Sequence, residues 1–131
     1  MKFSLASLPT TLQQISVPLL VLFISLISFL FDSSLSELLV YQRSLVTQGE
    51  IWRVFSGHFF HTNGFHFLLN AAAVIMLWAL HGHFYTIKSY LIVFMVSAII
   101  CSIGIHWFSL DIEQYVGLSG VLHGIFIWGA I

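Results

Sequence analysis

The chain has 131 residues, of which 59% are hydrophobic and 7% are charged, and its mean hydropathy is +1.00. This composition is too apolar for a water-soluble globular domain and indicates an integral membrane protein, whose first partner is the lipid bilayer. The formal net charge is −1, and the four Lys and Arg residues form no basic run. We therefore expect no nucleic-acid partner. Cys101 is the only cysteine, which excludes an intramolecular disulfide.

The hydrophobic segments predict an all-α, polytopic bundle of transmembrane helices, because about 20 apolar residues cross the roughly 30 Å hydrocarbon core. We expect three complete spans and the start of a fourth, covering about 12–31, 59–80, 90–108 and 115–131. A helix from Ser119 to Ile131 rises about 1.5 Å per residue, which is roughly 20 Å and too short for a crossing. We interpret residues 1–131 as a single transmembrane domain that is incomplete at its C-terminus.

The basic residues give an expected orientation. Lys2 precedes the first span and Lys88 lies between the second and third, whereas Arg43 and Arg53 in the first loop weaken the positive-inside pattern. We expect a cytoplasmic N-terminus, which places Ser119 a few residues inside the outer membrane face, where it is accessible from the extracytoplasmic side. The first span is too long for a typical signal peptide, and no small-residue cleavage site follows it.

The loop between the first two spans, residues 32–57, mixes apolar and polar side chains. Loops of this length usually carry structure or function of their own. We expect short helices that lie in the membrane interface, with Tyr41 and Trp52 as anchors.

The segment Tyr115-Val-Gly-Leu-Ser-Gly-Val-Leu-His123 opens the last apolar run. It places the Ser119 hydroxyl where a helix should begin inside a membrane, beside unpaired backbone N–H groups and the positive end of the helix dipole. Such a site is suited to hold a developing oxyanion. Gly117 and Gly120 are expected to leave room for a substrate backbone. Ser119 is therefore the candidate nucleophile.

A second polar group surrounds the start of the second span and contains His58, His61, His66 and Asn70. Polar side chains are costly at membrane depth, so they point to function. His66 and Asn70 are four residues apart and share one helix face, where an imidazole and an amide can both donate to one oxyanion. For His58 and His61, the alternative is that they tie the first loop to the helices.

The histidine pairs His58-x-x-His61 and His81-x-His83 also have spacings that a metal centre can use. No HExxH motif, companion cysteine or intramembrane carboxylate accompanies them. The second pair is expected at the opposite face, roughly 30 Å from the first. We expect neither a metal nor another cofactor, and a histidine-ligated membrane metalloprotein is the least favoured alternative.

Taken together, the two polar segments resemble the rhomboid intramembrane serine proteases, over about Gly49 to Ile131. The matching residues, in order, are Arg53, His61, His66-x-x-x-Asn70 and Gly117-Leu-Ser119-Gly120. The residue sequence from Tyr115 to Gly124 is more particularly similar to the rhombosortase branch, as are Trp52-Arg53 and His61-Thr-Asn upstream of it. These bacterial proteases process membrane proteins that carry glycine-glycine C-terminal sorting tails.

The resemblance implies a serine endopeptidase whose substrates are membrane-anchored proteins. Ser119 takes the nucleophile role, and His66, Asn70 and the Ser119 N–H match the oxyanion hole. His61 matches a histidine that supports the first loop and water access, and Arg53 matches a structural residue of that loop.

The departure from the family is that its general base, a histidine on the sixth core helix, is absent from these 131 residues. His123 follows Ser119 by one helical turn and fills a place where the family often has an aromatic ring. A self-sufficient pair of Ser119 and His123 is a less favoured alternative, because no carboxylate lies near to orient the base. We therefore expect the 131-residue chain to be inactive alone, and a catalytically inactive rhomboid-like fragment or binding protein is the main rival hypothesis.

Overall fold

The computed structural model describes residues 7–131, so Lys2, on which the expected orientation partly rests, lies outside the described residues. Three helices are long and apolar enough to cross a membrane: α1 (Leu12–Leu30), α5 (Gly64–His81) and α6 (Ile87–Phe108). The fourth apolar helix, α7 (Ser119–Ala130), is shorter. The predicted all-α, polytopic fold is confirmed.

Two of the helices begin at residues other than those expected, because polar side chains cap them. The Asn63 side chain accepts a hydrogen bond from the His66 N–H at 2.9 Å, so α5 begins at Gly64 rather than near residue 59. Thr86 and Ser89 form a reciprocal capping box, so α6 begins at Ile87 rather than near residue 90. Such caps satisfy backbone N–H groups that have no partner within the helix.

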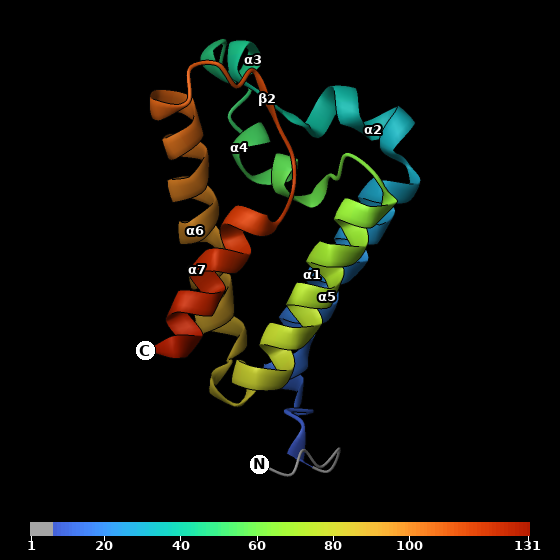
Figure 1. The fold of residues 1–131 in the computed structure, drawn as a ribbon, viewed down its shortest axis with the longest axis vertical. Coiled ribbons are helices and arrows are strands. Elements are labelled where there is room, and N and C mark those ends of the chain that lie inside the picture. Colours follow the sequence, from blue (N-terminus) through green and yellow to red (C-terminus); the bar gives the residue numbers. More distant parts are fainter. Residues whose placement is uncertain (1–6) are drawn as a thin grey trace.

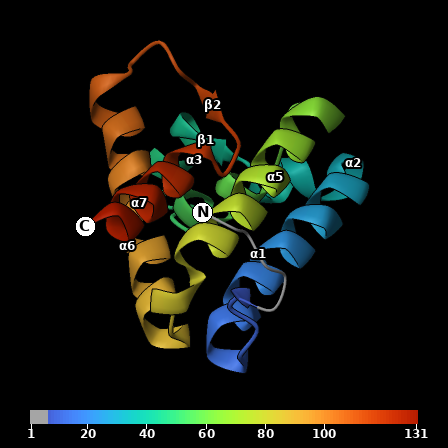
Figure 2. The ribbon, with the colours of Figure 1, turned by 60° about the horizontal axis from the view of Figure 1, so that its bottom comes forward.

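Helix α7 lies between α5 and α6, and α1 covers the other side of α5 (Figures 1 and 2). The core is made by buried apolar side chains from these helices, among them Val21, Val74, Leu77, Phe94, Ala98, Val121, Leu122 and Ile125. On the outer faces, large apolar side chains such as Leu19, Phe23, Leu68 and Ile100 are exposed. An apolar exterior of this kind is what lipid requires.

The first loop folds into short elements at one end of the bundle, as expected (Figure 1). They are α2 (Asp32–Leu39), β1 (Tyr41–Gln42), α3 (Arg43–Thr47), α4 (Arg53–Ser56) and the 3-10 turn η2 (Gly57–Phe59). A second 3-10 turn, η3 (Gly82–Phe84), joins α5 to α6 at the opposite end.

Strand β1 pairs antiparallel with β2 (Gln114–Tyr115), which places Tyr41 opposite Tyr115. The expected role of Tyr41 as an interfacial anchor is therefore wrong. Its side chain is 1% exposed, and its hydroxyl forms a 2.9 Å hydrogen bond with His106 Nδ1. Strand pairing turned this ring inward, and the sequence pattern of the loop alone carries no signal for such a pairing. Trp52, by contrast, is about half exposed and donates from Nε1 to the Leu38 carbonyl.

Candidate active site at the head of helix α7

Ser119 is the first residue of α7, and the chain reaches it through a sharp turn after β2. Gly117 makes that turn with φ +115°, a left-handed conformation that favours glycine. The side chain of Leu118, which precedes the helix, does not cap it. The first backbone N–H groups of α7 lie beside the serine, where the positive end of the helix dipole favours negative charge.

His66 reaches from α5 toward this turn. A Cβ atom added to Gly117 would lie 2.8 Å from both Cε1 and Nε2 of the His66 ring. On the other side of the ring, Nδ1 receives a hydrogen bond from the Thr62 N–H at 3.3 Å. Because an N–H can only donate, Nδ1 must be the acceptor nitrogen of the neutral ring. The proton of neutral His66 is therefore on Nε2, the nitrogen that faces the head of α7.

Asn70 lies one turn further along α5 and is 5% exposed. Its Nδ2 donates one hydrogen bond to the His66 carbonyl at 2.9 Å, which leaves the second hydrogen of the amide to donate elsewhere. Asn70, His66 and Ser119 line one cavity of about 430 Å³ between α5 and α7. The structure thus brings together the three side chains that the sequence assigned to one site, although α6 separates their helices along the chain.

His123 lines the same cavity from the next turn of α7. Its Nδ1 donates to the Ser119 carbonyl at 2.6 Å, because a carbonyl oxygen can only accept. The neutral ring therefore carries a lone pair on Nε2. The rest of the cavity wall is apolar and includes Leu69, Met76 and Phe126.

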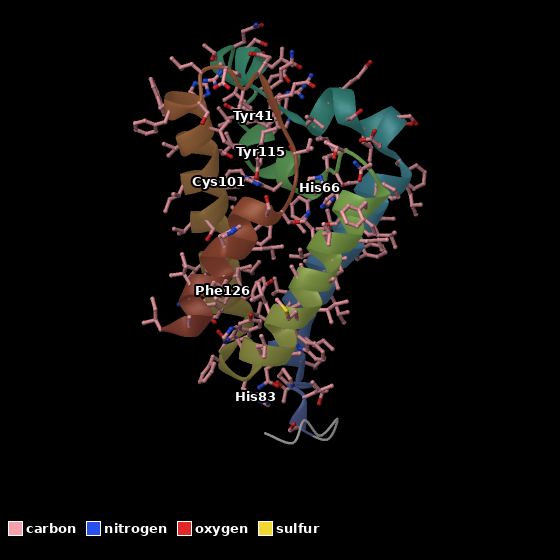
Figure 3. All side chains as sticks on the ribbon, viewed as in Figure 1. Tyr41, His66, His83, Cys101, Tyr115 and Phe126 are labelled. Atoms are coloured by element: carbon pink, nitrogen blue, oxygen red, sulfur yellow. The ribbon has the colours of Figure 1, made fainter. Side chains whose placement is uncertain are left out.

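The two glycines beside Ser119 do not leave the open space that was expected of them. A Cβ at Gly120 would lie 2.3 Å from Cys101 Sγ and 3.3 Å from the Tyr115 hydroxyl oxygen. The protein's own side chains fill that space, as the His66 ring does at Gly117. These glycines permit close packing of α5 and α6 against the head of α7 (Figure 3).

His61 and His58 lie behind the site. His61 is buried, and its ring meets the His66 ring edge to face at 5.0 Å. Burial, and secondarily the neighbouring His66, lower the pKa of His61 from 6.5 to about 4, so its ring is neutral at physiological pH. His58 bonds the Gly117 carbonyl at 3.3 Å and the Ser102 hydroxyl at 3.1 Å. His58 thus ties η2 to α6 and to the turn before Ser119, which agrees with the alternative interpretation from the sequence.

Arg53 is 3% exposed and holds the first loop together. It forms an ion pair with Glu50 at 2.6 Å and donates to the carbonyl oxygens of Val40 and Glu37 at 2.7 and 2.8 Å. The backbone on which β1 is built is fixed by these bonds. Arg53 does not line the cavity beside Ser119, so its contacts in the structure are those of a loop residue.

Arg43 is a residue whose contribution the sequence did not reveal. Its guanidinium donates to carbonyl oxygens at and beyond the C-terminal end of α6, those of Ile105, His106, Ser109 and Ile112. Its backbone N–H donates to the Glu113 carbonyl at 2.8 Å. These bonds fix the segment that leads into β2 and Ser119. No local motif signals such contacts, because they join residues more than 60 positions apart.

Within residues 7–131, no three His, Cys, Asp or Glu side chains come together in a way that could hold a metal ion. His81 contacts Phe126 and the backbone near Gly129, at the end of the bundle away from His58 and His61. The two histidine pairs noted in the sequence therefore stay apart in the fold.

The fold and the site define a class: a polytopic helical membrane protein with a serine at the head of a helix that lies between two long apolar helices. The model of the rhomboid domain family matches residues 48–130. The chain belongs to the rhomboid family, whose members are generally intramembrane serine proteases that act on membrane protein substrates. No curated protein gives a significant match to the chain.

Proposed function

We propose that this protein is a serine endopeptidase of the rhombosortase type, located in a bacterial inner membrane, and that Ser119 is its nucleophile. The observation that carries the proposal is the shared cavity, lined by Ser119 from α7 and by His66 and Asn70 from α5. A hydroxyl at a helix N-terminus with two hydrogen-bond donors opposite is an arrangement suited to acyl transfer.

In the proposed reaction, Ser119 Oγ forms a bond to the scissile carbonyl carbon while its proton passes to a general base. The carbonyl oxygen becomes an oxyanion, which the Nε2–H of His66, the free amide hydrogen of Asn70 and the Ser119 N–H stabilise. Collapse of this intermediate breaks the C–N bond, and the base returns the proton to the leaving amine. Water, or an amine, then attacks the acyl-enzyme ester.

The general base is the component that the site still needs. The resemblance implies a histidine from a further helix, which is not among the 131 residues. His123 is the candidate within the chain, because its Nε2 is an acceptor on the cavity wall, but no carboxylate orients the ring. We therefore expect the 131-residue chain to react slowly with acylating probes, and faster once a segment that supplies the base is joined to it.

The test measures cleavage of a membrane-anchored reporter with a glycine-glycine C-terminal tail, together with labelling of Ser119 by a fluorophosphonate. It uses the 131-residue chain and also this chain extended by any sequence that continues its reading frame. Ser119→Ala should abolish both signals in whichever form is active. Cleavage retained in Ser119→Ala, or lost on adding EDTA, would refute the proposal. Binding of the reporter without cleavage or labelling in either form would favour the rival hypothesis of an inactive binding protein.

The branch is tested separately from the activity. A matched reporter in which the glycine-glycine pair is replaced by alanine-alanine keeps the membrane anchor and changes the sorting tail alone. Preference for the glycine-glycine reporter supports the rhombosortase type. Equal cleavage of the two reporters would support a rhomboid protease of another specificity.

A further inference from the structure

Thr62 holds the His66 ring from the side away from α7, and the proposed reaction assigns it no role. It lies in the bend that leads into α5, four residues before His66. Its backbone N–H donates to His66 Nδ1 at 3.3 Å, and its hydroxyl oxygen lies 3.2 Å from the same nitrogen. The backbone and the side chain of Thr62 thus both meet a single nitrogen of the ring.

The direction of these two bonds follows from what each group can donate. A backbone N–H can only donate, so Nδ1 is the nitrogen of the neutral ring that carries the lone pair. The Thr62 hydroxyl beside that lone pair must then donate as well, because Nδ1 has no proton to give it. Both distances are long for a hydrogen bond, as expected where two donors share one lone pair.

The start of α5 does not depend on the Thr62 hydroxyl. The residue that caps this helix is Asn63, whose side chain accepts from the His66 N–H at 2.9 Å. Thr62 is exposed, so water can solvate its hydroxyl if the contact with the ring is lost. The bond from the hydroxyl to Nδ1 therefore acts on the His66 ring and can be removed without removing the cap.

Polarisation connects this bond to the opposite edge of the ring. Donors at Nδ1 draw electron density from the imidazole, which makes the Nε2–H a stronger donor. Nε2 would lie 2.8 Å from a Cβ placed on Gly117, in the turn before Ser119, and His66 lines the Ser119 cavity. A group that accepts from Nε2 in this cavity is therefore affected by what Thr62 donates on the other side of the ring.

We propose that Thr62 is a positioning residue, whose N–H and hydroxyl both donate to His66 Nδ1 and so hold the His66 proton on Nε2, at the head of α7. The inference rests on the proposed role of His66 as a donor to the oxyanion. Thr62 is not among the residues that line the Ser119 cavity, and it acts through His66. The contact itself needs no catalysis and can be measured without it.

The first test observes the ring nitrogens directly, with ¹⁵N-imidazole histidine in the chain and the protein in detergent micelles. The chain has seven histidines, and His66→Gln identifies the signals of His66. At about pH 8.5, where an ordinary histidine is neutral, the parent should show a proton on Nε2 and a hydrogen-bonded lone pair on Nδ1. Thr62→Val removes the hydroxyl and keeps the backbone N–H, so it should move the Nδ1 signal toward that of a free lone pair. Thr62→Ser should restore it.

The matched control is Thr47→Val, which removes a threonine hydroxyl at the same end of the bundle, where it donates to the Arg43 carbonyl at 2.9 Å. It should leave both nitrogen signals of His66 in place. The Asn63 cap is retained in every variant, so thermal midpoints should stay close to that of the parent. An Nδ1 signal that is the same in the parent and in Thr62→Val, or a parent ring with its proton on Nδ1, would overturn the inference.

The second test measures turnover of the membrane-anchored reporter by the active form. Loss of one neutral hydrogen bond should lower the kcat of Thr62→Val by about two- to tenfold. KM should stay within about twofold, as expected for an effect on a donor that acts in the transition state. Thr62→Ser should recover kcat. A loss that Thr62→Ser does not recover would make Thr62 a structural residue and contradict the inference.

The two tests separate failure of the inference from failure of the proposed function. Cleavage of the reporter together with an Nδ1 signal that ignores Thr62→Val refutes the role of Thr62 and leaves the protease standing. An Nδ1 signal that responds to Thr62→Val, in a protein whose Ser119 never reacts with any acylating probe, supports the contact and refutes the protease.

Discussion

Asn70 shows how one buried amide can serve the fold and the site together. One hydrogen of Nδ2 is held by the His66 carbonyl at 2.9 Å, and the other is free to face the cavity. The first bond fixes the amide, so in the proposed reaction the second hydrogen would need no reorganisation when charge develops on the substrate oxygen. The proposed donor would therefore be oriented before the substrate arrives.

Asn70→Ala should lower turnover of the active form by about 10²- to 10³-fold, the usual effect of losing one oxyanion donor. The measurement is turnover per folded molecule in detergent micelles. Asn63→Ala is the matched control, because it removes an amide that caps α5 without lining the cavity. That variant should lose about 1 kcal/mol of stability and retain its turnover. Equal turnover in the two variants would remove Asn70 from the oxyanion hole.

His61 predicts how stability depends on pH. Its pKa is about 4 in the folded protein, against 6.5 for an ordinary histidine. Between these values the unfolded chain binds a proton that the folded protein rejects, so stability falls as the pH falls from about 6.5 to 4. The thermal midpoint in micelles should follow this decrease, and His61→Phe should flatten it. A midpoint that is constant over this window in the unsubstituted protein would contradict the prediction.

Ser119, His66 and Asn70 could be selected from the sequence because their signals are local. One signal is a serine between glycines where a helix begins, and the other is a pair of polar residues four positions apart. Helix periodicity alone is enough to recognise both. Tyr115 and the close packing at Gly120 could not be found in this way. They depend on how β1 meets β2 and on how α6 approaches α7, which involve residues far apart in the chain.

At the scale of elements, Arg43 joins the first loop to the end of α6. The last carbonyl groups of a helix have no partner within it, and a cation near them is favourable. Through a planar group with five donors, Arg43 binds two carbonyls in the last turn of α6, those of Ile105 and His106, and two beyond the helix, those of Ser109 and Ile112. The end of α6 and the path into β2 are thereby held together by a single side chain.

Arg43→Ala should destabilise the protein by at least about 2 kcal/mol, since charge-assisted hydrogen bonds contribute about 1.5 to 3 kcal/mol each and do not add fully. Arg43→Lys keeps the charge but cannot bind several carbonyls at once with a planar group. Its stability should therefore lie between those of the unsubstituted protein and Arg43→Ala. Unfolding midpoints in micelles give the ranking. Full stability in Arg43→Lys would show that charge alone is responsible.

Helices α6 and α7 pack at close range, and small residues make this approach possible. A Cβ placed on Gly124 would lie 1.9 Å from Ser97 Oγ and 2.7 Å from Ser97 Cβ. On α6 itself, nothing lies within 4 Å of a Cβ placed on Gly104. A glycine in these helices therefore marks a close contact only where the fold turns it toward a neighbouring helix.

Gly124→Ala should therefore push α7 away from α6 and lower the thermal midpoint, whereas Gly104→Ala should leave it unchanged or raise it slightly. The second variant is a matched control, because it makes the same substitution on a neighbouring helix. Ser97→Gly combined with Gly124→Ala should recover part of the loss, since the added methyl then has space. Equal midpoints for the two alanine variants would exclude close packing at Gly124.

For the whole molecule, hydropathy was sufficient to predict three spans and a shorter fourth helix, because lipid imposes length and composition on each of them. The first residues of α5 and α6 differ by a few positions from those expected, because Asn63 and Thr86 cap these helices. Neighbour relations were not readable from hydropathy. That α5 packs on α7 was required by the grouping of Ser119 with His66 and Asn70, and the fold fulfils this requirement.

The fold also separates the two ends of the bundle, which makes the orientation testable. Ser44 in α3 lies at the end that carries the short elements of the first loop, and Lys88 lies at the opposite end beside η3 (Figure 1). Both side chains are exposed. A lysine in the first turn of α6, beside the short connection between two spans, favours the cytoplasmic side, so Ser44 and the head of α7 should face outward.

In the Cys101→Ala background, Ser44→Cys should react with a membrane-impermeant maleimide added to intact cells whose outer membrane has been made permeable. Lys88→Cys should react only after the inner membrane is opened. The two variants are controls for each other, because each thiol is exposed and only its side of the membrane differs. The reverse pattern would place the Ser119 cavity on the cytoplasmic side. Substrate tails that emerge on the outer face could then not reach the nucleophile, and the sorting-tail specificity would have to be abandoned even if Ser119 proved reactive.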